Sequence, residues 1–235
     1  MSAALPVAVI GAAGRIGSFA CEYIDGAREV SLAARIEIAD DLAGALADSG
    51  ARVALDVTVA GLGLAHGLTI LEAGLRPVIG TSGVDQSAVD ELDRRARELG
   101  LGGIVVPNFC LGVWLLERLG RLAVAHFPEV EIIEEHHPGK RDSPSGTAAQ
   151  LACSLERERG ARAGAGPRGA VPIHSLRLPG LHSNHALRFG GSGETLTLRH
   201  ETHDLAAFGP GLLAAIGYAA EASGVVLGLD AALPS

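Results

Sequence analysis

The chain has 235 residues, a length that allows one large domain or two modest ones and is ample for a buried core. Hydrophobic residues make up 48% of it and glycine occurs 32 times, which favours an α/β protein whose loops approach small ligands and argues against disorder. The formal net charge of −8 disfavours nucleic acid as the main partner.

The compartment is suggested by the cysteines and by the absence of targeting segments. Three cysteines without a CxxC spacing fit a reducing cytosol, and the N-terminus lacks the basic start of a signal peptide. No uninterrupted apolar run reaches the roughly 18 residues that suggest a membrane span. We therefore expect a soluble cytoplasmic protein with no membrane partner.

The first part of the chain alternates between strand and helix patterns. Short, continuous apolar runs predict parallel strands buried on both faces, at residues 6–10, 30–36, 53–59, 77–79 and 103–106. Segments of helical period separate them, at 18–25, 40–50, 62–73 and 85–98. This repeated β-α-β order predicts the α/β class, with a right-handed, Rossmann-type doubly wound parallel sheet.

A glycine motif joins the first expected strand to the first expected helix. It reads Gly11-Ala12-Ala13-Gly14-Arg15-Ile16-Gly17, a G-x-x-G-x-x-G variant of the dinucleotide fingerprint. The first glycine turns the chain, the second lets the backbone approach a pyrophosphate, and the third lets the helix pack on the strand. Arg15 adds a positive charge for a phosphate. We predict that residues 11–17 bind a dinucleotide.

Glu37 ends the second expected strand, 20 residues beyond Gly17. A carboxylate there accepts hydrogen bonds from the adenine ribose hydroxyls and repels the extra phosphate of NADP. Arg35 nearby softens that preference, so we expect NADH to be favoured, with NADPH also admitted. The alternative is that Glu37 is an ordinary solvated strand end.

The fourth expected strand runs into Gly80-Thr81-Ser82-Gly83. A glycine-flanked turn at the carboxyl end of a parallel strand is where a nicotinamide or ribose would rest. The competing interpretation is a plain loop. The fifth strand ends similarly, at Pro107-Asn108-Phe109.

The pattern changes in the second half of the chain. A helix expected at 112–125 carries Trp114, for which we expect a packing role. Polar and apolar residues then alternate at 129–135, 173–178, 186–189 and 195–200, as in strands of an open-faced sheet. Residues 160–169 have the composition of a flexible loop, and a last helix expected at 210–223 could return to the first domain.

Residues 134–147, EEHHPGKRDSPSGT, concentrate the groups with chemistry. His136, His137 and Lys140 precede Ser145-Gly146-Thr147, which opens a helical stretch. A helix N-terminus attracts anions because its unpaired N–H groups and its dipole point at the ligand. Imidazole titrates near neutral pH and can deliver a proton. The segment predicts a site that binds and protonates a carboxylate-bearing substrate; the alternative is a polar loop before a capped helix.

Two histidine pairs, His182-x-x-His185 and His200-x-x-His203, have a spacing that zinc ligands can adopt. No cysteine or well-placed carboxylate completes a ligand shell. We expect no metal site.

Taken together, VAVIGAAGRIG, Glu37, GTSG, PNFCLGV and EEHHPGKRDSPSGTA resemble, in order and spacing, the 4-hydroxy-tetrahydrodipicolinate reductase family. The resemblance covers nearly the whole chain, and its most specific part is HHPGKRDSPSGT. It implies a dinucleotide-binding domain over 1–107, to which 209–235 returns. It also implies a mixed α/β domain over 108–208 that binds substrate and builds a homotetramer.

The resemblance also implies roles at matching positions. His136 matches the family's proton donor and Lys140 its second catalytic cation. The substrate's carboxylates would be held by His137, Lys140, Ser145, Gly146 and Thr147. Cofactor contacts would come from Gly11, Ala12, Ala13, Gly14, Arg15, Ile16, Gly17, Glu37, Gly80, Thr81, Ser82, Pro107, Asn108 and Phe109. The implied reaction reduces a cyclic imine dicarboxylate with NAD(P)H in the diaminopimelate and lysine pathway.

Two departures keep other functions open. Pro138-Gly139 stand where the family usually has a longer or basic pair, and Leu205 stands where it commonly has arginine. A second hypothesis is therefore a related reductase acting on a different cyclic imine or unsaturated acid. A third is a non-catalytic NAD(P)-sensing protein, which predicts a degraded proton donor, whereas His136 and Lys140 are both present.

Overall fold

The computed structural model describes residues 3–127, 129–161 and 169–233. Contacts divide the chain into two compact units. Unit 1 comprises Met1–Phe109 and Phe208–Ser235, and unit 2 comprises Cys110–Ala207. The flexible loop expected at 160–169 falls almost wholly on 162–168, outside the described residues.

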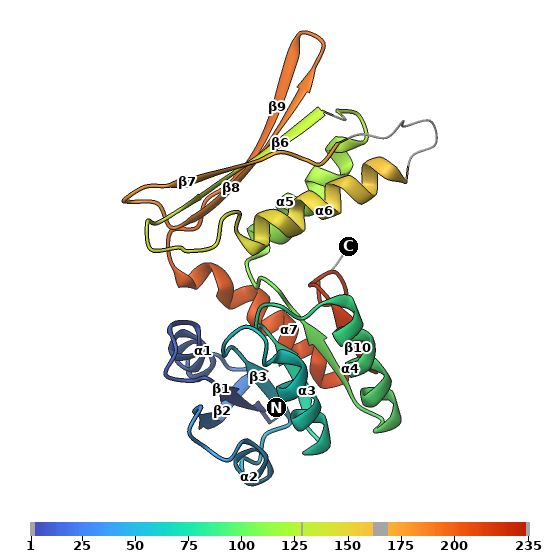
Figure 1. The fold of residues 1–235 in the computed structure, drawn as a ribbon. Helices are drawn as coiled ribbons and strands as arrows, with labels where there is room; N and C mark the ends of the chain where they lie inside the picture. The colour runs from blue at the N-terminus through green and yellow to red at the C-terminus, as the bar shows by residue number, and fades with distance from the viewer. Residues whose placement is uncertain (1–2, 128, 162–168, 234–235) are drawn as a thin grey trace. The chain divides into compact units, whose positions relative to one another are not determined.

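The described residues of unit 1 form a six-stranded parallel sheet with strand order β10-β5-β4-β3-β1-β2 (Figure 1). Its strands are β1 (Leu5–Ile10), β2 (Val30–Ile36), β3 (Val53–Asp56), β4 (Arg76–Ile79), β5 (Gly102–Val105) and β10 (Gly224–Leu227). Its helices are α1 (Arg15–Asp25), α2 (Leu42–Asp48), α3 (Gly63–Glu72), α4 (Gln86–Glu98) and α7 (Gly209–Glu221). The predicted doubly wound, Rossmann-type sheet is confirmed.

The order of the strands locates a ligand site. The chain goes from β1 to β2 on one side of β1, and then crosses back to β3 on the other side. In open α/β sheets ligands bind outside the carboxyl ends of the strands at such a switch point. We therefore expect ligand contacts from the loops after β1, β2, β3 and β4.

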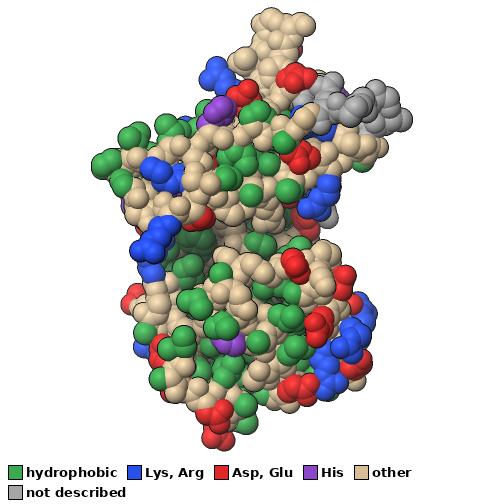
Figure 2. All heavy atoms as spheres, in the orientation of Figure 1, with side chains coloured by type: hydrophobic (Ala, Val, Ile, Leu, Met, Phe, Trp, Pro, Cys, Tyr) green, Lys and Arg blue, Asp and Glu red, His purple; other side chains and the backbone are tan. Residues whose placement is uncertain are grey.

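Burial explains why these segments are strands. Every residue of β3 and β5 is buried, as the continuous apolar runs predicted for a sheet covered on both faces. The helices are amphipathic instead: α4 buries Val89, Leu92 and Ala96 and carries charges on its other side. Figure 2 shows charged side chains of both signs over α4, where the ion pairs Arg94–Glu98 and Arg97–Asp93 form.

Two element boundaries in unit 1 differ from expectation by three residues, and one strand was not predicted. The third strand ends at Asp56 rather than 59, because Thr58 turns back and donates to the Asp56 carboxylate. The first helix begins at Arg15, so the end of the glycine motif already belongs to α1. β10 was not predicted; its place beside β5 is fixed by pairing and by Val225 N donating to Asp93.

The described residues of unit 2 form a mixed four-stranded sheet of order β7-β6-β8-β9. Its strands are β6 (Glu129–His136), β7 (Ile173–Arg177), β8 (Ser183–Gly191) and β9 (Glu194–His200). β6 pairs parallel with β7 and antiparallel with β8, which in turn pairs antiparallel with β9. Two helices, α5 (Leu111–Val124) and α6 (Gly146–Gly160), pack on one another (Figure 1). A short 3-10 helix, Leu205–Phe208, comes after β9.

The core of unit 2 lies between this sheet and the two helices. Ile132, Leu187 and Phe189 from the strands cluster with Leu151 and Leu155 from α6, all of them fully or almost fully buried. Trp114 on α5 is half-buried, with the Arg118 guanidinium 5.0 Å from its ring centroid.

Two glycines of α7 give a matched test of the packing in unit 1. A Cβ at Gly211 would overlap the carbonyl oxygen of Phe109, whereas one at Gly217 would meet nothing within 4 Å. Gly211→Ala should lower the free energy of unfolding by about 2 kcal/mol or more, because backbone must move to admit the methyl group. Gly217→Ala should leave it unchanged or raise it by up to about 1 kcal/mol, since alanine is the better helix former. Urea unfolding of both variants measures this, and equal effects would contradict the packing described.

Candidate active site

The residues of interest in unit 2 lie where β6 ends and α6 begins. Along β6, alternate residues point into the core, so Val130 and Ile132 are buried and so, two and four positions further on, are Glu134 and His136. The strand period therefore puts a carboxylate and an imidazole side by side on the buried face. Charged groups stay buried only when they are paired and hydrogen-bonded.

Glu134 is fully buried, and both of its oxygens accept hydrogen bonds. Arg177 donates from Nη2 to Oε1 at 2.7 Å and from Nη1 to Oε2 at 3.0 Å. The backbone N–H of Ser145 donates to Oε1 at 3.3 Å, and His136 Nδ1 lies against Oε2. Burial alone would raise the pKa of Glu134, but hydrogen bonds from Arg177, Ser175 and His136 outweigh it and lower the pKa to about 2. The carboxylate is ionised at neutral pH.

His136 is 4% exposed and is held from both sides. Its Nδ1 faces Glu134, and its Nε2 lies 3.2 Å from the hydroxyl of Ser183, the residue opposite it on β8. Burial lowers the pKa of the imidazole, and the Glu134 carboxylate opposes that shift. A lowered pKa makes the protonated imidazole a stronger acid.

The other predicted substrate-binding residues lie between the end of β6 and the first turn of α6. Lys140, the only lysine in the sequence, donates from Nζ to Asp142 Oδ1 at 2.8 Å. His137 is exposed. Ser145 is buried and caps α6, its hydroxyl accepting from Ala148 N at 3.2 Å. Gly146, which is exposed, and Thr147, which is half-buried, form the first turn of α6.

His185 was not predicted as part of this site. It is 1% exposed, with Nε2 3.4 Å from the Ser145 hydroxyl. Its ring stands edge-on to that of His136, with centroids 5.5 Å apart and planes at 80°. Burial, followed by the neighbouring His136, lowers the pKa of His185 to about 4. His185 therefore joins the α6 N-cap to the His136 ring as a neutral imidazole.

The four histidines whose spacing resembled that of zinc ligands do not form a metal site in the described residues. His185 lies directly opposite His200 in the β8–β9 pairing. Within residues 3–127, 129–161 and 169–233, no three His, Cys, Asp or Glu side chains gather closely enough to hold a metal ion.

In unit 1, the glycine motif forms the turn between β1 and α1, and close approaches explain its glycines. Gly11 has φ of 81°, which favours glycine, and a Cβ at Gly17 would overlap the carbonyl oxygen of Gly11. Glu37 reaches this turn from the end of β2, its Oε1 accepting from Ala13 N at 2.6 Å. The next residue, Ile38, is 81% exposed. A glycine cradle, a carboxylate and an exposed apolar side chain fit an adenine dinucleotide.

The two remaining predicted cofactor segments meet each other in unit 1. Gly80 follows β4, and a Cβ there would lie 2.5 Å from the ring of Phe109, which follows β5. Thr81 is buried, with its hydroxyl 3.4 Å from that of Thr58 after β3. Ser82 and Pro107 are exposed, and Asn108 is half-buried. The structure thus brings the predicted segments to the carboxyl ends of neighbouring strands.

Sequence reasoning missed Arg177, Ser183 and His185, and it did not give Glu134 a role. One signal was present: in EVEIIEEH the charged Glu134 occupies an inward position of the strand alternation. An inward charge requires a partner elsewhere in the chain. The pattern does not say which residue that partner is.

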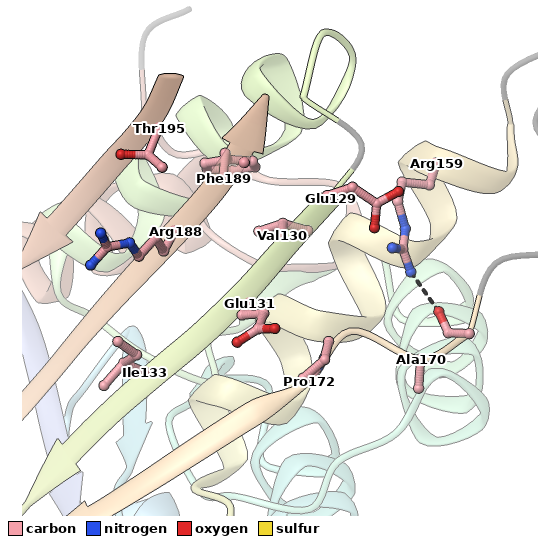
Figure 3. Close-up of a pocket in the computed structure, with 12 residues that line it drawn as sticks. Glu129, Val130, Glu131, Ile133, Arg159, Ala170, Pro172, Arg188, Phe189 and Thr195 are labelled. Carbon is pink, nitrogen blue, oxygen red and sulfur yellow. Dashed lines mark hydrogen bonds between the residues drawn. The ribbon is translucent and has the colours of Figure 1, made fainter. Parts of the chain in front are cut away.

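A cavity of about 530 Å³ in unit 2 lies away from all of these groups (Figure 3). Glu129, Glu131 and Ile133 of β6 line it together with Arg188 and Thr195 from β8 and β9. These β6 residues alternate with the buried ones, so they belong to the opposite face of the sheet. The cavity contains none of the predicted site residues.

A Rossmann sheet with a glycine cradle, and a second unit with imidazole and ammonium groups at a helix N-terminus, define a pyridine-nucleotide-dependent reductase. Family models for dihydrodipicolinate reductase match the chain over nearly its whole length: the N-terminus model covers residues 5–109 and the C-terminus model covers 112–233. The chain belongs to the dihydrodipicolinate reductase family.

Individual relatives agree with this assignment. The chain is 37% identical over 238 residues to 4-hydroxy-tetrahydrodipicolinate reductase of Legionella pneumophila (strain Lens), covering 95% of this chain and 97% of the relative. It is 39% identical over 244 residues to that of Beutenbergia cavernae, covering 97% and 98%. Among solved structures, the dipicolinate-bound dihydrodipicolinate reductase from Paenisporosarcina sp. TG-14 superposes with a TM-score of 0.82 at 29% identity, covering 96% of this chain and 98% of that one.

A probable dehydrogenase from Thermotoga maritima superposes with a TM-score of 0.67 at 11% identity, over 97% of this chain and 92% of that one, which shows a shared fold. Across the described part of the chain, no helix has the length and apolar character needed to cross a membrane.

The pKa of His185 makes stability depend on pH. An unfolded histidine titrates near 6.5, whereas folded His185 titrates at about 4, so the unfolded state binds more protons between these values. Stability from the neutral, buried imidazole is fully present above pH 6.5 and is lost as the pH falls towards 4, by roughly 3 kcal/mol. His185→Gln should flatten this fall in the unfolding free energy. His136 and His200, whose pKa values are also lowered, contribute to the remaining slope, and carboxylates with lowered pKa values such as Glu134 add to it towards pH 4.

The matched control is His174→Gln, because His174 is an exposed strand histidine paired with Glu131. It should keep the slope of the parent protein. If His185→Gln keeps the parent slope between pH 4 and 6.5 as well, the burial of a neutral His185 is wrong.

Proposed function

We propose that the protein reduces 4-hydroxy-tetrahydrodipicolinate to tetrahydrodipicolinate with NAD(P)H, in the diaminopimelate and lysine pathway. The observation that carries the proposal is the gathering of His136 and Lys140 at the N-terminus of α6 in a member of this family. The curated relatives from Legionella pneumophila and Beutenbergia cavernae bear the name of this activity. We propose the dinucleotide-binding role for residues 1–107 with 209–235, and the substrate-binding role for 108–208.

The substrate carries two carboxylates, and the chain offers matching groups. His137, Lys140, the Ser145 hydroxyl and the backbone N–H groups of Gly146 and Thr147 hold them. Since the chain has a net charge of −8, binding depends on this local concentration of cations and N–H donors. Lys140 exchanges its ion pair with Asp142 for one with substrate.

The reduction needs a hydride and a proton. When bound along residues 11–17, Glu37, 80–82 and 107–109, the reduced dinucleotide supplies the hydride. Lys140 stabilises the negative charge that develops on the substrate, and His136 donates the proton. The dianionic substrate raises the pKa of His136 from its lowered value in the free protein, because opposite charge favours the imidazolium. Protonation of the acid is thereby coupled to binding.

We further propose that the chain forms a homotetramer through residues 108–208, as the family resemblance implies. Exposed apolar side chains on and just after β7 support a subunit interface in this part of the chain: Leu176 is 37% exposed and Leu178 is 53% exposed.

The direct test measures loss of NADH and NADPH absorbance with substrate generated from pyruvate and aspartate semialdehyde by the preceding synthase. The parent protein should turn over, and His136→Ala and Lys140→Ala should each lower kcat/KM by about a hundredfold or more. Arg141→Ala is the matched control for Lys140→Ala, since it removes the exposed neighbouring cation. It should change kcat/KM by less than about threefold.

Absence of turnover, with NADH still bound tightly, would contradict the substrate assignment and favour a different cyclic imine. If the parent protein binds NAD(P)H but reduces neither this substrate nor any other cyclic imine or unsaturated acid, the result would favour the non-catalytic NAD(P)-sensing protein.

Glu37 should set the choice between the two cofactors. Its carboxylate lies on the glycine turn, where the 2′-phosphate of NADPH would meet a like charge. Glu37→Gln should raise the ratio of kcat/KM with NADPH to that with NADH by about tenfold or more, a change of roughly 1.4 kcal/mol in discrimination. Glu22→Gln, which neutralises an exposed carboxylate on α1, should leave the ratio unchanged. An unchanged ratio in Glu37→Gln would contradict this role.

A further inference from the structure

We propose that Glu134, held by Arg177, is a positioning residue that fixes His136 as the Nδ1–H tautomer, so that Nε2, beside Ser183, carries the proton delivered to substrate. The inference rests on the proposed function for the delivery step. The tautomer itself can be measured without any activity.

The Glu134 carboxylate is ionised and can only accept hydrogen bonds. It receives two parallel bonds from the Arg177 guanidinium, at 2.7 and 3.0 Å, and one from Ser145 N at 3.3 Å. This bidentate arrangement is the strongest that arginine makes with a carboxylate, and it keeps Glu134 charged although the side chain is fully buried. The atom of His136 that faces Oε2 must therefore be a donor.

The His136 ring takes its tautomer from this contact. Because Nδ1 faces Glu134, Nδ1 carries hydrogen in both protonation states. The proton that comes and goes is then the one on Nε2. A carboxylate that orients a histidine from Nδ1 in this way determines which nitrogen does the acid–base chemistry.

The Ser183 hydroxyl completes the surroundings of the ring. It lies 3.2 Å from Nε2 and belongs to the strand residue opposite His136, so the pair is held by the β6–β8 register. A hydroxyl both donates and accepts. It can donate to Nε2 of the neutral ring and accept from Nε2–H of the charged ring. Ser183 thus satisfies this nitrogen before and after the proton is transferred.

The groups around His136 give the sign of the electrostatic effect. Burial lowers the pKa of His136, Glu134 on the same strand raises it, and Lys140 after β6 and Arg177 on β7 lower it. His185 on β8 stands against the ring and is neutral near pH 7, its pKa being lowered to about 4. Removing the Glu134 charge should therefore lower the pKa of His136 further.

The transfer balances within these groups. The Nε2–H bond breaks and its electron pair stays on Nε2, while a C–H bond forms with the electron pair of the reduced substrate carbon. His136 ends as the neutral Nδ1–H imidazole, still donating to Glu134. Glu134 gains no proton, and the ring is recharged from solvent before the next cycle.

The deciding experiment observes the imidazole nitrogens of the full chain by NMR, with histidine labelled with nitrogen-15 and His136 assigned from its loss in His136→Ala. Above the titration of His136, the parent protein should show a protonated Nδ1 and an unprotonated Nε2. Glu134→Gln should shift this towards a mixture of tautomers. Glu131→Gln, a matched change at an exposed carboxylate of β6 that also has a histidine partner, should show the parent pattern. A protonated Nε2 with a bare Nδ1 in the neutral parent ring would overturn the proposal.

The pH dependence of kcat separates positioning from a purely structural role. In Glu134→Gln, kcat should fall by about tenfold or more, with KM changed by less than about threefold, and the loss of activity at high pH should begin at lower pH. Glu134→Asp, which restores the charge, should lose activity at the same high pH as the parent protein. If Glu134→Gln loses activity at the same high pH as the parent protein, the inference is overturned.

A parent protein with the expected tautomer but no turnover would reject the proposed function and leave the tautomer assignment standing. Ser183→Ala covers the case in which Glu134→Gln does not fold. It should keep Nδ1 protonated, because Glu134 is untouched, and should change the chemical shift of Nε2. An unaltered Nε2 signal would contradict the contact with Ser183.

Discussion

The ion pair between Glu134 and Arg177 is the interaction on which the arrangement of unit 2 depends. It joins β6 to β7, receives the backbone N–H of Ser145 at the start of α6, and orients the His136 ring. Removing one partner of a buried pair leaves an uncompensated charge and typically costs about 3–5 kcal/mol. The inward carboxylate on β6 occupies a position of the core pattern, and its contacts with Arg177, Ser145 and His136 fix the geometry of the site.

Positive character is generated locally in a protein that is negatively charged overall. The α6 N-terminus, Lys140 and His136 lie within one short segment, and Ser145 both caps the helix and contacts buried His185. The dinucleotide groups lie instead at the carboxyl ends of the unit 1 strands. The two units therefore divide the chemistry, because unit 1 offers a glycine cradle and unit 2 offers cations and an acid for a dicarboxylate.

The features that could be predicted from the sequence are those carried by residues close together in the chain. Continuous apolar runs and a contiguous glycine motif indicated the doubly wound sheet, and His136, Lys140 and Ser145 could be proposed as site residues because they fall within one segment. Arg177, Ser183 and His185 could not be found this way, since they meet Glu134, His136 and Ser145 across 43, 47 and 40 residues of chain. Strand pairing creates those contacts. β10 was missed because its short apolar run comes soon after the last predicted helix, and because its pairing partner β5 lies far away in the chain.

The organising role of the Glu134–Arg177 ion pair can be measured directly by a double-mutant cycle on the free energy of unfolding, with Glu134→Gln, Arg177→Met and the double variant. If the buried ion pair organises the site, each single variant should be strongly destabilised. The double variant should then recover part of the loss, with a coupling energy of about 2 kcal/mol or more. Additive effects, with a coupling below about 0.5 kcal/mol, would contradict this role of the ion pair, because Glu134 and Arg177 would then contribute independently.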